Sequence, residues 1–195
     1  MTDPLLPTGD GHTDLTDEDS DGLIPTYIST RGELYEAEQK SIAEALLRKA
    51  PTAKQLLDDR YLRELHRSMF GQVWKWAGKY RLRETNLGIE PRAIASEVRK
   101  LTDDTAAWIE YKTYRALEIV VRFHHRLVAI HPFPDGNGRF GRVAANMLSV
   151  ALGGENLSWG SHLDVDTPEL RNRYLQALHA SDEGDMSQLM DFASS

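Results

Sequence analysis

Apolar residues recur at intervals of three and four along most of this 195-residue chain from residue 32 onward. That spacing places them on one face of an α-helix, whereas a half-buried strand would show strict alternation. Such stretches end before Pro51 and recur near residues 56–69, 94–108, 117–127, 143–151 and 167–179. Long alternating stretches are scarce, so the sequence predicts a mainly α fold built as a helical bundle.

The chain has no cysteine. Disulfides, thiolate zinc sites, iron–sulfur clusters and cysteine nucleophiles are therefore excluded, and a reducing compartment fits. No apolar run approaches the roughly 18–20 residues that span a bilayer, and the start of the chain lacks the basic and apolar parts of a signal peptide. We expect a cytoplasmic protein without a membrane partner.

The net charge of −7 is concentrated at the N-terminus. Residues 1–22 hold seven acids and no Lys or Arg, and the remaining 23 acids balance the 23 basic residues. The neutral body gives no direct indication of nucleic-acid binding. Residues 1–25 form a predicted acidic arm. Within it, residues 17–22 resemble the start of a calcium-binding loop, but position twelve is Ile28 rather than Glu, which favours an acidic turn.

The most informative segment is His131-Pro-Phe-Pro-Asp-Gly-Asn-Gly-Arg-Phe-Gly-Arg142, which lies between two predicted helices. Gly136 and Gly138 allow the backbone to approach a ligand just before a helix begins. Free N–H groups and the positive end of the helix dipole at that point favour an anion such as phosphate.

Charged side chains of the same segment suit phosphate chemistry. Arg139 and Arg142, three residues apart, would project from one helical face toward the anion. Asp135 could hold Mg²⁺ through oxygen, and His131 could take a proton from an incoming hydroxyl. Each residue alone fits an ordinary glycine-rich loop, whereas together they supply the parts of phosphoryl or nucleotidyl transfer. No Lys-Ser or Lys-Thr follows the glycines, so the segment is not a P-loop.

Two other functions are also compatible with these residues. One is a nucleotide-binding regulatory module without transfer activity, although simple binding does not require a base such as His131. The other is a metal-dependent hydrolase built from His124, His125, His131 and Asp135. Adjacent histidines on a helix point in different directions, which disfavours convergence on one metal.

The segment 131–142 resembles the complete signature of the Fic family, His-x-Phe-x-(Asp or Glu)-Gly-Asn-Gly-Arg-x-x-Arg, at every position. The upstream Phe70-Gly-Gln-Val-Trp-Lys-Trp-Ala-Gly-Lys-Tyr-Arg81 is also similar to Fic domains. The resemblance implies an N-terminal, potentially inhibitory helix in residues 26–50 and a Fic domain in residues 51–195, with its core at about 55–180. The arm with Gly22-Leu-Ile-Pro, together with Thr30-Arg-Gly-Glu-Leu, is similar to Fic proteins carried on mobile elements, called mobile mystery protein B.

The resemblance implies transfer of AMP from ATP to a Ser, Thr or Tyr hydroxyl of a target protein. His131 would be the base and Asp135 the Mg²⁺ ligand. The remaining residues implied to bind ATP and its phosphates are Gly136, Asn137, Gly138, Arg139 and Arg142. The phosphate-transferring Doc branch has lysine at the position of Gly138, so AMP transfer is preferred. Use of another nucleotide and removal of AMP are the alternatives within the family.

In such enzymes a short β-hairpin flap above the site pairs with an extended target segment. The residues expected to form this docking flap are Asn86, Leu87, Gly88 and Ile89. The alternative is an ordinary connecting loop.

Fic enzymes are commonly held inactive by a helix of pattern (Ser or Thr)-x-x-x-Glu-(Gly or Asn). Only Glu33 has a Ser or Thr four residues before it, Ser29, but Leu34 replaces the final Gly or Asn. Glu33 therefore either inhibits the enzyme or simply favours the first turn of its helix. The family also implies a separate antitoxin or regulator, toxin-like behaviour and a homo-oligomer as possible features.

Overall fold

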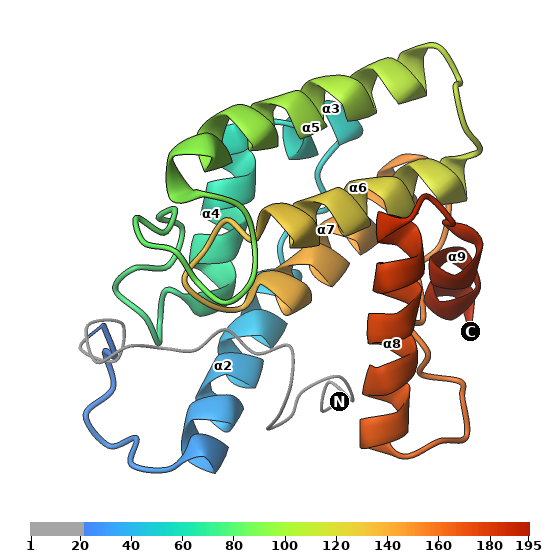
Figure 1. The fold of residues 1–195 in the computed structure, drawn as a ribbon. Helices are drawn as coiled ribbons and strands as arrows, with labels where there is room; N and C mark the ends of the chain where they lie inside the picture. The colour runs from blue at the N-terminus through green and yellow to red at the C-terminus, as the bar shows by residue number, and fades with distance from the viewer. Residues whose placement is uncertain (1–21) are drawn as a thin grey trace.

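The structure is a computed structural model that describes residues 22–195. Nearly all of the predicted acidic arm, including the calcium-loop-like segment, lies outside the described residues. No helix within residues 22–195 is long and apolar enough to cross a membrane. The helices, shown in Figure 1, are α2 (Arg31–Leu46), α3 (Ala53–Leu56), α4 (Asp59–Phe70), the 3₁₀ turn η1 (Pro91–Ala93), α5 (Ile94–Glu110), α6 (Ala116–Ile130), α7 (Asn137–Ala151), α8 (Thr167–Asp182) and α9 (Ser187–Ser194).

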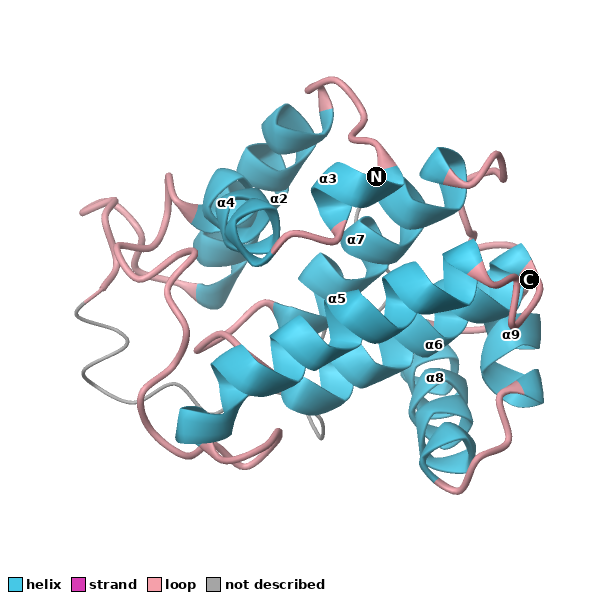
Figure 2. Cartoon of the chain, turned by 90° about the horizontal axis from the view of Figure 1, so that it is seen from above, coloured by secondary structure: helices cyan, strands magenta, loops and turns pink. Residues whose placement is uncertain are grey.

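The prediction of a mainly α fold is confirmed, and Figure 2 shows the described chain as helices and loops. Among residues 22–195 the only β pairing is an isolated antiparallel bridge between Leu23 and Trp74. The predicted β-hairpin flap is therefore wrong as secondary structure, and residues 82–90 form an irregular loop. The physical reason lies in a buried arginine, described below, whose side chain uses carbonyl groups that a hairpin would pair.

The centre of the fold is the pair α6 and α7, which pack against each other across a six-residue connection. Phe123 of α6, Phe140 of α7 and Phe133 of the connection are fully buried. Burial of one such side chain contributes about 1.5–3 kcal/mol to stability. Helix α5 packs on α6, and α2 packs on α4. The connection between α6 and α7 lies on the same side of the molecule as residues 71–90 (Figure 1), so two distant segments meet there.

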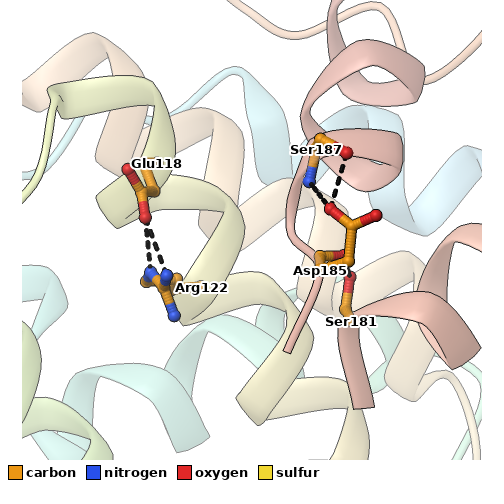
Figure 3. A network of polar contacts seen from close by, with 5 residues as sticks. All are labelled: Glu118, Arg122, Ser181, Asp185 and Ser187. Carbon is orange, nitrogen blue, oxygen red and sulfur yellow. Dashed lines mark hydrogen bonds and ion pairs between the residues drawn. The ribbon is translucent and has the colours of Figure 1, made fainter. Parts of the chain in front are cut away.

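The turn between α8 and α9 is closed by polar contacts, drawn in Figure 3. The carboxylate of Asp185 accepts hydrogen bonds from the backbone N–H of Ser187 at 2.9 Å and from its hydroxyl at 2.6 Å. These bonds satisfy a donor at the start of α9 that has no partner inside the helix. The same view shows Glu118 and Arg122, an ion pair one turn apart on α6.

Two histidines are fully buried in the core, one on α4 and one on α6. His66 of α4 lies between the N–H of Gly78, which donates to its Nδ1 at 3.1 Å, and the carbonyl of Asp135, 3.1 Å from its Nε2. Its ring stacks on Phe133 at 3.7 Å. His124 of α6 contacts the Tyr174 hydroxyl at 3.0 Å. Burial is the main cause that lowers the pKa of each histidine to about 3.

These buried histidines predict an acid-sensitive fold. Unfolding returns each of them to an ordinary pKa near 6.5, so between about pH 6.5 and 3 the unfolded chain binds more protons than the folded one. The free energy of unfolding therefore falls as the pH drops through that window, by about 1 kcal/mol per pH unit for each histidine. Denaturant unfolding followed at pH 7, 6 and 5 measures this slope.

The variant His66→Gln should unfold with a shallower pH dependence than the wild type. His179→Gln is the matched control, because the His179 side chain is 81% exposed. Equal slopes for the wild type and for His66→Gln would contradict the assignment to His66. Should that variant fail to fold, NMR titration of His66 in the wild type gives its pKa directly.

Candidate active site

The connection between α6 and α7 begins at a residue with left-handed backbone. His131 has φ 53° and ψ 61°, and its N–H bonds the Leu127 carbonyl at 3.3 Å, closing the last turn of α6. Pro132 follows and cannot continue the helix. The connection ends at Gly136, where φ is +78°. The sequence thus turns the chain sharply on both sides of Asp135.

His131 is buried, with 6% of its surface exposed. Burial, and to a lesser extent the positive charge of Arg81, lower the pKa of His131 to about 4. A hydrogen bond with the Val128 backbone acts in the opposite direction and fixes the ring. At neutral pH the imidazole is therefore neutral, which is the form that can accept a proton.

The side chain of Asn137 bridges the loop by bonding the backbone of Phe133. Its Oδ1 accepts from the N–H of Phe133 at 2.9 Å, and its Nδ2 donates to the Phe133 carbonyl at 2.8 Å. Asn137 is 2% exposed and Phe133 is fully buried. The amide thus holds the loop in shape, and an anion at this point would meet the backbone N–H groups at the start of α7.

Asp135 lies at the tip of the loop, with 23% of its side chain exposed. Burial raises the pKa of Asp135, Arg139 lowers it, and the negative charge of Glu38 raises it again. The Asp135 Oδ2 lies 3.6 Å from Arg139 Nη2. This is a partly accessible oxygen donor of the kind that Mg²⁺ prefers.

The two arginines of the segment have different surroundings. Arg139 contacts Glu38 of α2 at 2.6 Å and lies over the Phe70 ring, 4.8 Å from its centroid. Arg142 lies over the ring of Tyr174, 5.8 Å from its centroid. A Cβ added to Gly138 would sit 3.9 Å from Arg142 Nη1, so this guanidinium borders the first turn of α7.

Arg81 is a residue of the site whose role was not predicted from the sequence. It is 3% exposed, and its Nε donates to the His131 carbonyl at 2.7 Å. Its Nη2 donates to the carbonyls of Ile89 and Ile130, and its own N–H bonds the Pro132 carbonyl at 3.0 Å. One guanidinium therefore joins the predicted flap to the end of α6.

The predicted docking residues lie directly above the histidine. Gly88 has φ +97°, and a Cβ there would overlap the Cβ of His131. The Ile89 N–H donates to the Ile130 carbonyl at 3.3 Å, while the Thr85 hydroxyl bonds the Leu87 carbonyl. Asn86 is exposed between them. The loop covers the site, and its role in target docking stays a prediction.

Ser29 and Glu33 lie at the start of α2. The Glu33 carboxylate accepts from the Ser29 N–H at 2.8 Å, the Ser29 hydroxyl at 3.0 Å and the Thr30 N–H at 2.9 Å. The Thr30 hydroxyl in turn accepts from the Glu33 N–H, which completes a capping box. These bonds, the one from the Ser29 backbone first, lower the pKa of Glu33. An inhibitory role requires this carboxylate to leave the cap, and it stays a prediction.

The histidines considered for a metal-dependent hydrolase have separate partners. His124 contacts Tyr174, and His125 contacts Asp182 at 2.7 Å, both on α8. Across residues 22–195 no group of three or more His, Asp or Glu side chains is arranged to hold a metal ion. The geometry brings His131 and Asp135 together with the start of α7, without the neighbouring histidines.

The two glycines at the start of α7 should differ in how much stability the protein loses when each is replaced by alanine. A Cβ at Gly136 would press on the fully buried Phe70 ring, 2.6 Å from its Cζ, and would require a positive φ. Gly136→Ala should therefore lower the free energy of unfolding by about 2–4 kcal/mol. A Cβ at Gly138 meets only Arg142 within 4 Å. Gly138→Ala should change stability by less than about 1 kcal/mol.

Thermal and denaturant unfolding of the two variants test this pair. Because the variants add the same methyl group two residues apart, each is the control for the other. Equal destabilisation by both would contradict the geometry of the loop.

Comparison with known proteins finds a matching family and similar sequences. The sequence pattern of the Fic/DOC family matches residues 56–149. A probable protein adenylyltransferase of Sinorhizobium fredii is 33% identical over an alignment of 141 residues, and the match covers 68% of this chain and 69% of that protein. A protein adenylyltransferase of Caenorhabditis briggsae is 28% identical over 131 residues, and the match spans only 24% of its length.

A solved structure has the same fold. The BepC effector protein of Bartonella tribocorum superposes with a TM-score of 0.67 at 18% identity, over 92% of this chain and 97% of that one. The complete signature at residues 131–142 lies within the matched region. From its similarity to the Sinorhizobium protein, together with this signature, the chain belongs to the Fic/DOC family.

Proposed function

We propose that this protein transfers AMP from ATP to a side-chain hydroxyl of a target protein. The observation that carries the proposal is a buried, neutral histidine held at the end of α6 beside the N-terminus of α7. This pairing puts a base next to a phosphate-binding helix end. The names of the relatives, protein adenylyltransferases, support the same reaction.

The nucleotide would bind through its phosphates at the start of α7. Backbone N–H groups there would contact the phosphates, and the Arg142 guanidinium lies near them, 3.9 Å from where a Cβ of Gly138 would sit. The BepC protein, which has the same fold, was crystallised with bound AMPPNP, an ATP analogue, which supports nucleotide binding by this fold. Asp135 would hold Mg²⁺ as a single carboxylate ligand beside the phosphates. The ion, when bound, neutralises charge on the phosphate oxygens.

In the proposed step the target hydroxyl oxygen attacks the α-phosphorus of ATP. A bond forms between that oxygen and phosphorus, while the bond from the α-phosphorus to the bridging oxygen breaks and pyrophosphate leaves. The hydroxyl proton passes to the neutral imidazole of His131. The loop at residues 86–89, which covers His131, would align the target segment for attack.

The finer features of the family remain predictions for this chain. They are the cytoplasmic location, toxin-like behaviour, an antitoxin or regulator, and a homo-oligomer. A nucleotide-binding module without transfer, the use of another nucleotide, and the removal of AMP are outcomes that the first experiment distinguishes from the proposal.

AMP transfer is tested with ATP labelled on the α-phosphate, Mg²⁺ and a lysate of the host cell. The wild type should label protein, and His131→Ala should reduce the rate by at least about 100-fold, because it removes the general base. His179→Ala, at an exposed histidine, should label as the wild type does. ATP labelled on the γ-phosphate should give no label beyond that of the lysate without the protein.

The failures of this experiment have distinct meanings. Label from γ-phosphate alone would indicate phosphate transfer, and label that survives in His131→Ala would remove the assigned base. ATP binding without any transfer, with other nucleotides also silent, would favour the regulatory module. Glu33→Gly, which removes the capping carboxylate of α2, tests the inhibitory role, and labelling equal to that of the wild type would exclude it. Much stronger labelling would instead establish Glu33 as inhibitory.

The pH dependence of the reaction follows from the lowered pKa of His131. The imidazole must be neutral to accept a proton, so activity falls only as the pH drops toward about 4. At pH 5.5 about 95% of such a histidine is neutral, whereas an ordinary histidine of pKa 6.5 would be about 10% neutral. We expect kcat/KM at pH 5.5 to stay close to its value at pH 7.5.

Circular dichroism at both pH values provides the control, because it confirms that the enzyme remains folded. A folded enzyme that loses most of its kcat/KM between pH 7 and 5.5 would show that His131 titrates normally or is not the base.

A further inference from the structure

Glu38 of α2 is a buried carboxylate outside the signature segment. Its Oε2 lies 2.6 Å from Arg139 Nη1, and its Oε1 accepts from Trp74 Nε1 at 2.6 Å. The side chains of Glu38 and Arg139 are 6% and 8% exposed. Both carboxylate oxygens are therefore engaged, and the contact with Arg139 joins residues 101 positions apart in the sequence.

Arg139 consequently lies between two carboxylates. Glu38 contacts Nη1 at 2.6 Å, and Asp135 lies 3.6 Å from Nη2. The Phe70 ring covers the guanidinium from one side, 4.8 Å away. The planar group is thus fixed in position and orientation, and Asp135 faces one edge of a fixed cation.

The charges of this cluster favour a further cation. Two carboxylates and one guanidinium leave one negative charge in a mostly buried place, where Coulomb interactions are stronger than in water. Removing Glu38 would also take one carboxylate partner from the buried charge of Arg139, and the Asp135 carboxylate lies 3.6 Å from that charge. A tighter Arg139–Asp135 pair would withdraw Asp135 from any metal ion.

We propose that Glu38 is a positioning residue that fixes Arg139 and thereby keeps the Asp135 carboxylate available for Mg²⁺ bound with ATP. The inference rests on the proposed function and adds a residue of α2 to its site. Glu38 acts through Arg139 and does not itself contact the nucleotide. Partners outside the ligand shell commonly change metal affinity by 10–100-fold when they are mutated.

The test is a calorimetric titration of ATP into the full chain carrying His131→Ala, so that no turnover occurs. Each titration is made with Mg²⁺ and again with EDTA. Glu38→Gln should weaken ATP binding in Mg²⁺ by about 10-fold. With EDTA its binding should be unchanged or tighter, because a negative charge has been removed near the phosphates.

Glu44→Gln is the matched control on the same helix. Glu44 accepts from Gln72 Nε2 at 2.7 Å at an exposed position, so the variant also removes a carboxylate that α2 directs at the segment after α4. It should bind ATP as the parent does under both conditions. A merely structural role of Glu38 would weaken binding equally with and without Mg²⁺, and would overturn the inference.

Two other results would also overturn it. Unchanged binding by Glu38→Gln would show that Asp135 does not depend on Glu38. Tighter binding in Mg²⁺ would show that Glu38 competes with the phosphates for Arg139. If Glu38→Gln does not fold, Trp74→Phe removes one hydrogen bond to Glu38 and keeps its charge. That variant should then weaken ATP binding in Mg²⁺ by about 2–5-fold, and unchanged binding would overturn the inference.

The parent titration separates this inference from the proposed function. A parent chain that binds no ATP under either condition would overturn the proposed function, and the inference with it. ATP binding by the parent, with the expected AMP transfer by the wild type, leaves the comparison of Glu38→Gln with Glu44→Gln to decide the role of Glu38 alone.

Discussion

The buried guanidinium of Arg81 holds the two halves of the site together. The last carbonyls of a helix have no partner inside it, and Pro132 supplies no N–H group to the turn that follows α6. Arg81 donates to the carbonyls of Ile130 and His131 at this helix end, and also to those of Arg83 and Ile89 in the covering loop. A cation at a helix C-terminus is also favoured by the helix dipole. Burial is the larger cause of the low pKa of His131, and the same charge adds to it, so Arg81 both positions His131 and helps to keep it neutral.

This interaction also explains why the sequence predicted the helices better than the loop above the site. The helices follow from apolar spacing, and the sharp turn at residues 131–136 follows from its prolines and glycines. In contrast, residues 81–91 alternate between more and less exposed positions as a strand would. The hairpin fails because side-chain N–H groups of Arg81 occupy carbonyls that a second strand would use. When a side chain takes the place of backbone donors in this way, the sequence shows no periodic pattern that would reveal it.

Long-range polar contacts account for the other residues that sequence reasoning missed. In the sequence, Glu38 is indistinguishable from a solvent-facing glutamate of an amphipathic helix. Only the packing of α2 on α4 brings it to Arg139. His66 has no motif around it, yet it links Gly78 to the Asp135 carbonyl. The charged residues of the signature could be found from their close spacing. The residues that hold the signature residues in position come from α2, α4 and the segment after α4. No local sequence pattern indicates which polar side chains of these segments will be buried.

The two arginines of the signature show how similar residues acquire separate tasks. Sequence spacing alone suggests that Arg139 and Arg142 face one anion together. In the structure Arg139 is compensated by Glu38 and faces Asp135, so its positive charge acts mainly within the protein. Arg142 instead borders the first turn of α7, where its charge adds to the positive end of the helix dipole. Under the proposed function, attraction for a triphosphate would depend chiefly on Arg142 and the backbone, while Arg139 would maintain the carboxylate beside them. The division follows from the side chain that contacts each arginine, Glu38 of α2 for Arg139 and Tyr174 of α8 for Arg142.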